Sequence, residues 1–307
     1  MATVNNIFIL KLKSLVRRFM PSLMPMSLRF SSRFITMKRE RDYFIKGVRS
    51  SNSKEMSLAL LSQPRAGTQV CEAVIEELYQ STGGLSLNTG KFFFHYNASA
   101  AKKVNNNDWI ENNLEKSGYF YGHLGPFSSL EGLPEIQYIL MTRDPRDVLV
   151  SHYYSVREAH VINSKKMMEK VTRLKEMTLS EYCHYEPILQ DLERYIAQTE
   201  LIRTSILSHL YIRYEDLMYD PLESLEKITK FLDVKGIDLS KMSQEHFSIL
   251  KDGEDLSSHR RSGKWGQFRE KLSRNDQEYL WERFGDSIKP LGYHKDNLEK
   301  VEQPFTQ

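Results

Sequence analysis

The order of apolar and polar stretches along the chain predicts a repeated strand–turn–helix unit. Residues 57–62, SLALLS, form a short apolar run that is typical of a buried strand. A turn with proline and glycine follows, and apolar side chains then recur at helical spacing, at Val70, Val74, Ile75 and Leu78. The first unit is therefore a buried strand, a turn and an amphipathic helix.

The same order of elements recurs twice farther along the chain. Residues 136–141, IQYILM, predict a strand, after which Asp144 is suited to cap a helix whose first residue is Pro145. Residues 207–214, LSHLYIRY, predict another strand, and Pro221 marks the start of a helix beyond it. Strands that alternate with helices predict an α/β fold, a single domain with a central, mostly parallel sheet flanked by helices.

No long linker, repeat or low-complexity block interrupts the chain after Asp42. We therefore divide it into a basic N-terminal segment (residues 1–42), one domain (residues 43–295) and a C-terminal tail (residues 296–307). Ligands of open parallel sheets bind beyond the carboxyl ends of the strands. The turns after the predicted strands should consequently converge on one site.

The charge of the chain is distributed unevenly. Its net charge is +3, but the first 39 residues contain eight Lys or Arg and no acidic residue, which leaves 35 basic and 40 acidic residues in the remainder. A basic excess confined to one end argues against a general nucleic-acid binder, so we expect no nucleic-acid partner.

The basic N-terminal segment has no uninterrupted apolar stretch near the roughly 18 residues of a membrane-spanning helix. Three interpretations stay open: an amphipathic segment that rests on anionic lipid, an Arg- and Ser-rich organelle transit peptide, or a solvated tail. The first is favoured. We therefore expect a cytoplasmic protein with peripheral membrane contact, and organelle targeting stays open.

Cysteine and histidine usage points away from cross-links and metals. The only cysteines, Cys71 and Cys183, lie far apart, and the nine histidines form no cluster with metal-ligand spacing. A reducing compartment and a site without metal are the expectation.

The first turn, residues 65–69, has the composition of an anion-binding loop. Gly67 permits close approach to the backbone, and N–H groups at the start of the following helix would point at a bound anion. Thr68 adds a hydroxyl donor, and Arg65 adds a permanent positive charge. Taken alone, such a turn is structural about as often as it is functional.

The second turn also combines cations with a hydroxyl. Arg143, Arg146 and Ser151 have the chemistry to surround a phosphate. The alternative is that both arginines are solvated or pair with Asp144 and Asp147.

A third basic segment, residues 259–273, reads HRRSGKWGQFREKLS. Its arginines, Ser262 and glycines would suit a loop that wraps phosphate oxygens, with Trp265 and Phe268 as packing or stacking groups. By composition alone it would be a charged surface loop.

The combination of these segments in this order resembles the sulfotransferases that use 3'-phosphoadenosine-5'-phosphosulfate (PAPS). The resemblance covers residues 58–290 and is carried by QPRAGTQV, RDPRDVLVSHYYS, YEDLMYDP and RSGKWGQF. It implies a P-loop-like turn that binds the 5'-phosphosulfate of the co-substrate, formed by Arg65, Ala66, Gly67, Thr68 and Gln69. It further implies a 3'-phosphate site formed by Arg143 and Ser151, with Arg261, Ser262 and Gly263 closing over it, and an adenine contact at Tyr214.

The resemblance also nominates a catalytic base. The segment YFYGHLGPF, residues 119–127, stands where family members carry a His-Leu-Pro-like segment, which places His123 in that role. A neutral imidazole, with an ordinary pKa of about 6.5, accepts a hydroxyl proton near neutral pH. Arg65 would stabilise charge that develops on the transferred group. Tyr121 departs from the family pattern, because a lysine often precedes the base by two residues.

The implied reaction is transfer of a sulfuryl group from PAPS to an acceptor hydroxyl of a glycan, glycolipid or small alcohol. Residues 80–118 and 156–200 are expected to supply the acceptor loops, and the oligomeric state is open. The rival functions are a kinase-like P-loop nucleotide-binding protein and a non-catalytic, membrane-associated binding protein. Against the kinase, neither Gly-Lys pair, at residues 90–91 and 263–264, precedes Ser or Thr.

Overall fold

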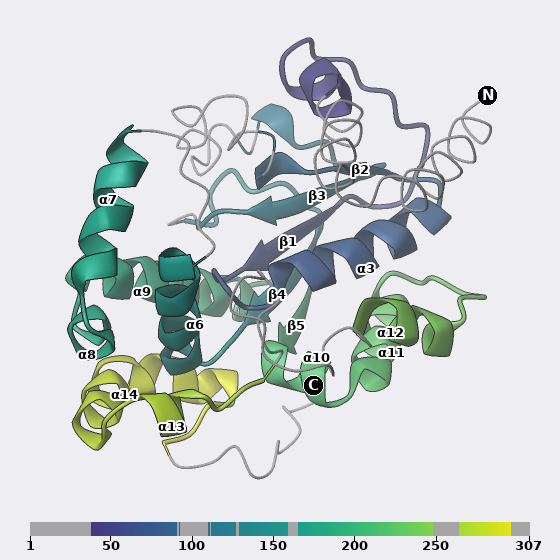
Figure 1. Cartoon of the computed structure of the whole chain (residues 1–307). Coiled ribbons are helices and arrows are strands. Elements are labelled where there is room, and N and C mark those ends of the chain that lie inside the picture. Colours follow the sequence, from purple (N-terminus) through teal and green to yellow (C-terminus); the bar gives the residue numbers. More distant parts are fainter. Residues whose placement is uncertain are drawn as a thin grey trace, which may run out of the picture.

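A computed structural model describes residues 38–90, 92, 110, 112–126, 129–158, 165–247 and 264–295 (Figure 1). Its centre is a five-stranded sheet in the order β2-β3-β1-β4-β5. The strands are β1 (Leu58–Ser62), β2 (Leu85–Leu87), β3 (Tyr119–Leu124), β4 (Gln137–Thr142) and β5 (His209–Arg213). All four neighbouring pairs are parallel. The predicted α/β fold with a parallel central sheet is confirmed.

Helices cover the sheet in two groups (Figure 1). The first group is α3 (Thr68–Ser81), α10 (Tyr214–Tyr219), α11 (Pro221–Phe231) and α12 (Leu239–Phe247). The second is α6 (Pro145–Glu158), α7 (Lys165–Glu176), α8 (Leu179–Cys183), α9 (Glu186–Arg203), α13 (Phe268–Lys271) and α14 (Arg274–Ile288), followed by the short 3-10 helix η3 (Lys289–Leu291). Among the described residues, no helix is long and apolar enough to cross a membrane.

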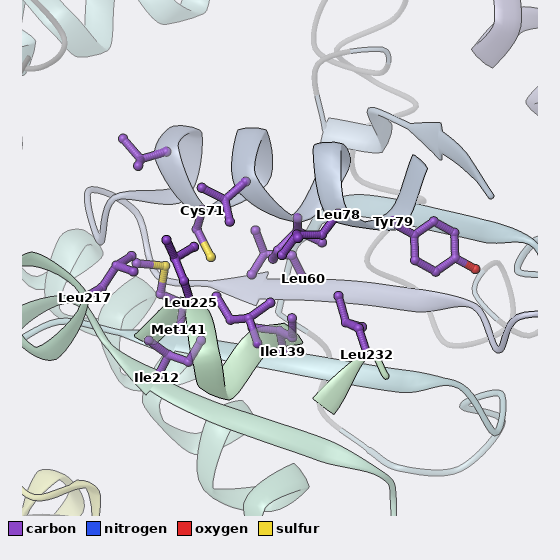
Figure 2. Close-up of a cluster of buried hydrophobic side chains, with 14 of the residues drawn as sticks. Leu60, Cys71, Leu78, Tyr79, Ile139, Met141, Ile212, Leu217, Leu225 and Leu232 are labelled. Carbon is purple, nitrogen blue, oxygen red and sulfur yellow. The ribbon is translucent and has the colours of Figure 1, made fainter. Parts of the chain in front are cut away.

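The core on the α3 side explains the uninterrupted apolar run of the first strand. Figure 2 shows Leu60, Ile139 and Ile212 of the strands facing Cys71 and Leu78 of α3, all of them buried. On the opposite side, alternate strand residues pack into a second cluster, which includes Ala59, Leu61, Tyr121, Tyr138 and Ile202. Every residue of β1 is therefore buried, as expected for a central parallel strand.

The predicted boundaries differ little from the observed ones, and the helix starts follow the predicted capping. Asp144 accepts a hydrogen bond from the Arg146 N–H at 2.9 Å, and α6 begins at Pro145. Asp220 caps α11, which begins at Pro221. The apolar pattern did not reveal β2, because three residues are too few for a periodicity. Residues 156–200 were expected to supply acceptor loops, but most of this region is helical and forms α7, α8 and most of α9.

A buried carboxylate attaches the first described residues to the edge of the sheet. Residues 38–44 are helical, and Arg39 Nη1 donates to the Ser86 carbonyl at 3.0 Å. Glu40 is 1% exposed, and its Oε1 accepts from the Asn88 N–H at 3.0 Å. Its Oε2 has no hydrogen-bond partner among the described residues. Burial raises the pKa of Glu40 to about 7.

Glu40→Gln is expected to stabilise the protein at pH 8 and to have little effect at pH 5. Because the folded state holds the Glu40 proton more tightly than the unfolded state, wild-type stability falls as pH rises from the ordinary pKa of 4.5 to about 7. Glutamine keeps an acceptor for Asn88 and removes this titration. Urea unfolding at pH 5, 6.5 and 8 measures the effect, with the exposed Glu55→Gln as control. A stability difference that does not vary with pH would contradict it.

Candidate active site

The turns after β1 and β4 lie side by side at the centre of the sheet. From β1 the chain continues to strands on one side, β2 and β3, and from β4 it continues to β5 on the other side. This reversal of direction is the topological switch point at which parallel α/β sheets bind ligands. The first two predicted turns are therefore neighbours, as the sequence predicted.

The backbone of the first turn is left-handed at two positions. Arg65 has φ 64° and Gly67 has φ 80°. A Cβ on Gly67 would lie 2.7 Å from the Tyr214 ring, so glycine is required there for space as well as for conformation. No side chain caps α3, whose first residue is Thr68. The first-turn N–H groups and the positive end of the helix dipole thus favour an anion at this point.

Arg65 connects the first turn to the second. Its Nε donates to Ser151 Oγ at 3.3 Å, although the two residues are 86 positions apart. Ser151 lies on α6 and is buried. The residues that the resemblance assigned to the two ends of the nucleotide are thus in direct contact.

Arg143 joins all three basic segments. It is 4% exposed, and its Nη1 donates to the Arg65 carbonyl at 3.1 Å while Nη2 donates to the Lys264 carbonyl at 2.9 Å. The guanidinium lies over the Tyr214 ring, 4.4 Å from the ring centroid. Its buried Nε has no hydrogen-bond partner among the described residues. One charged donor at the centre of the site is therefore left for a ligand.

Asp147 holds the described end of the third basic segment against the second turn. Its carboxylate accepts from the N–H groups of Gly266 at 2.6 Å and Phe268 at 3.0 Å, and it lies 3.4 Å from Arg143 Nη2. Burial raises the pKa of Asp147, an effect that Arg143 and the two N–H donors oppose. Arg261, Ser262 and Gly263 lie outside the described residues, so their contact with the 3'-phosphate stays a prediction.

Arg146, by contrast, has a structural role. It is 2% exposed, pairs with Asp144 at 2.7 Å and donates to the carbonyls of His294 and Lys295. Its guanidinium also lies 4.0 Å from the Phe268 ring centroid. These polar contacts are all internal. The alternative that pairs the arginines with Asp144 and Asp147 holds for both, because Arg143 also pairs with Asp147 at 3.4 Å.

His123 lies at the carboxyl end of β3, next to β1. A bulge shifts the register between the two strands, so that Ala59 pairs with Tyr121 but Leu60 pairs with His123. Paired residues of parallel strands point to the same face. His123 is therefore on the face of Leu60 and α3, where the first turn leads into the helix, and it is partly exposed.

The remaining predicted residues occupy varied positions. Ala66 is fully buried in the core, whereas Gln69 is exposed on the first turn of α3. Thr68 Oγ1 lies 2.7 Å from Ser62 Oγ. Tyr214 is buried between Gly67 and Arg143, and burial raises the pKa of its hydroxyl. Tyr121 is buried in the core, where its hydroxyl contacts Tyr43 at 2.6 Å.

Sequence reasoning missed two supporting residues. Gln63 Oε1 accepts from the Arg143 N–H at 3.0 Å and so joins the first two turns. Glu72 of α3 accepts from the His123 N–H at 2.9 Å. A polar residue at the end of an apolar strand could have drawn attention to Gln63, but nothing in the local pattern distinguishes Glu72 from a solvated helix residue.

The donor set fits a nucleotide phosphosulfate. Arg65 and Arg143 supply positive charge, Ser151 and Thr68 supply hydroxyls, and an uncapped helix start supplies N–H groups. The unsatisfied Arg143 Nε is what an anion would complete. Among the described residues, no group of three or more His, Cys, Asp or Glu side chains is placed to hold a metal ion. The expectation of a site without metal stays a prediction.

The comparisons with solved structures concern the fold of the chain. Mouse sulfotransferase SULT7A1, crystallised with PAP, superposes with a TM-score of 0.54 at 18% identity, over 82% of this chain and 90% of that one. Retinol dehydratase in complex with androsterone and inactive cofactor PAP gives a TM-score of 0.44 at 15% identity, over 81% and 86%. At these identities the likeness concerns the fold. No curated protein sequence matches the chain.

The family assignment comes from the sequence signature. Residues 60–292, well over half of the chain, match the family described as sulfotransferase domain. This match includes the first turn, His123, the second turn and the final helices, and it favours an enzyme over the kinase-like and non-catalytic alternatives. The chain therefore belongs to the sulfotransferase family, as the order of its motifs predicted.

Proposed function

We propose that this protein transfers a sulfuryl group from PAPS to the hydroxyl of an acceptor, with His123 as the general base. The observation that carries the proposal is the contact of Arg65 with Ser151 and of Arg143 with Arg65 at the switch point, beside the strand that has His123 near its carboxyl end. Two anion-binding segments in contact suit a ligand with an anionic group at each end.

Different residues of the chain would bind the two anionic groups of PAPS. The first-turn N–H groups, Arg65 and Thr68 would hold the phosphosulfate, and Ser151 and Arg143 would hold the 3'-phosphate. Tyr214 would pack against the adenine. PAPS supplies the sulfuryl group, and catalysis consists mainly of positioning together with stabilisation of developing charge.

His123 is proposed to accept the acceptor proton. Its backbone lies one strand away from the first turn, and its ring is on the α3 face of the sheet. Gly90 leaves room for the ring, because a Cβ there would lie 3.1 Å from His123 Nδ1. A neutral imidazole at this edge is suited to remove a hydroxyl proton as the acceptor oxygen attacks.

The acceptor is proposed to be a glycan, a glycolipid or a small alcohol, reached in part through residues 1–42 at a membrane surface. Residues 1–37 and part of the expected acceptor region lie outside the described residues. The basic, acid-free start of the chain supports an acceptor on an anionic surface.

A direct assay tests the proposed reaction. The full-length protein is incubated with ³⁵S-labelled PAPS and a panel of 2-naphthol, a sterol, galactosylceramide in vesicles and a soluble oligosaccharide. We expect labelled sulfate to appear on one hydroxyl class and to require folded protein. In parallel, 3',5'-phosphoadenosine should bind more tightly than ATP with Mg²⁺. Tighter ATP binding with no transfer to any panel member or lysate hydroxyl would contradict the proposal.

A further inference from the structure

The geometry points to Glu72 as the residue that positions His123 for proton transfer, through a hydrogen bond to the main chain of the β3 bulge. This inference rests on the proposed role of His123. It concerns a residue of α3 that is not one of the anion-binding groups.

The bulge determines which way His123 faces. In a regular strand His123 would share a face with Tyr121, because side chains alternate. Tyr121 and Leu124 both pack in the core on the face opposite α3. The extra residue, Gly122, breaks this alternation and brings His123 into register with Leu60 on the α3 face. Without the bulge, the imidazole would point into the opposite core.

The bulge also needs a hydrogen-bond acceptor from outside the sheet. β2 ends at Leu87, opposite Tyr121, so beyond that point β3 has a strand neighbour on one side only. Glu72 Oε1 accepts from the His123 N–H at 2.9 Å. Glu72 is 7% exposed and the hydrogen bond is partly buried, so removal of the carboxylate would cost the His123 N–H this acceptor in a partly shielded position.

Two glycines make room for the arrangement. A Cβ on Gly122 would lie 2.9 Å from Glu72 Oε1, too close for the hydrogen bond to persist unchanged. A Cβ on Gly90 would lie 3.1 Å from His123 Nδ1 and 3.2 Å from the His123 carbonyl. Glu72 thus holds the backbone of His123, while the absence of a side chain at Gly90 leaves room for its ring.

The same helix carries the anion-binding turn at its start. Glu72 lies near the beginning of α3, which runs from Thr68 to Ser81. A hydrogen bond from this helix to the strand of His123 therefore sets the distance between the base and the phosphosulfate loop. Small displacements of a reacting group are costly, because a misplacement of about 1 Å can slow a reaction by roughly a hundredfold.

Three variants test the inference with the panel member that is sulfated fastest. Glu72→Ala should lower kcat by roughly tenfold or more, while the Kd for 3',5'-phosphoadenosine changes less than about twofold. Glu72→Gln keeps the carbonyl acceptor and should restore most of the turnover. Gly122→Ala should also lower kcat, because its Cβ would displace the Glu72 carboxylate. This variant keeps the test decisive if Glu72→Ala does not fold. Glu76→Ala, an exposed glutamate one turn farther along α3, is the matched control and should behave as wild type.

A double variant separates this inference from the proposed function. Because Glu72 acts through His123, the Glu72→Ala, His123→Ala variant should be no slower than His123→Ala alone. Three results would overturn the positioning role. The kcat losses of the two single variants could multiply in the double variant, Glu72→Ala could lose nucleotide affinity as strongly as kcat, or Glu72→Gln could be as slow as Glu72→Ala. Full turnover of His123→Ala would instead overturn the proposed base and leave the family assignment intact.

Discussion

His123→Ala is expected to lower the turnover number by about 10²- to 10⁴-fold, the usual contribution of a general base. Binding of 3',5'-phosphoadenosine should be nearly unchanged, because the residues proposed to bind the nucleotide follow β1, β4 and β5 rather than β3. Single-turnover transfer from labelled PAPS and isothermal titration with 3',5'-phosphoadenosine measure the two quantities on the same preparation.

A histidine elsewhere provides the control for this variant. His246 pairs with Glu77 at 3.0 Å on the surface of α12 and α3, away from the carboxyl ends of the strands. His246→Ala should leave turnover as in wild type. Equal turnover of His123→Ala and wild type would remove His123 from the mechanism, and a matching loss of nucleotide affinity would show that it acts in binding instead.

Arg143→Ala is expected to reduce affinity for 3',5'-phosphoadenosine by at least a hundredfold and to destabilise the fold. Removing one partner of a buried ion pair typically costs about 3–5 kcal/mol, because the other charge is left uncompensated, here that of Asp147. The variant also removes the donors to the Arg65 and Lys264 carbonyls, which hold two loops in place. Urea unfolding and calorimetric titration measure the two effects.

A second substitution separates stability from binding. Asp147→Asn removes the stranded charge but keeps an oxygen for the Gly266 N–H or the Phe268 N–H. The Arg143→Ala, Asp147→Asn protein should regain much of the lost stability and still bind the nucleotide weakly. If nucleotide affinity recovered together with stability, Arg143 would have only a structural role and its assignment to the 3'-phosphate would be wrong.

The sequence predicted the structure best where an element depends only on residues close to it in the chain. The apolar run of β1, the cap at Asp144 and the proline at position 221 each depend on neighbours within a few positions, and each was placed within one or two residues. The convergence of the turns followed from topology, since parallel strands bring their carboxyl ends to one edge. Motif order then supplied the family.

The features that the sequence could not reveal depend on distant partners. Arg143 and Arg146 look alike in RDPRD, yet one joins the basic segments and the other is enclosed by Asp144 and the carbonyls near the C-terminal end of the domain. The bulge at Gly122 follows from the register with β1 and from Glu72, 51 positions before His123. No local periodicity carries that information.

The reach of the Arg143 contacts has a consequence for how the protein acquires activity. Its guanidinium bonds to carbonyls 78 positions before it and 121 positions after it. Contacts between such distant segments close large loops, and the entropy of loop closure makes them slow to form. During synthesis the proposed nucleotide site cannot be complete until residue 264 has emerged from the ribosome. A chain that stops before the final helices should therefore fail to hold the co-substrate, even with β1, β4 and their turns already formed.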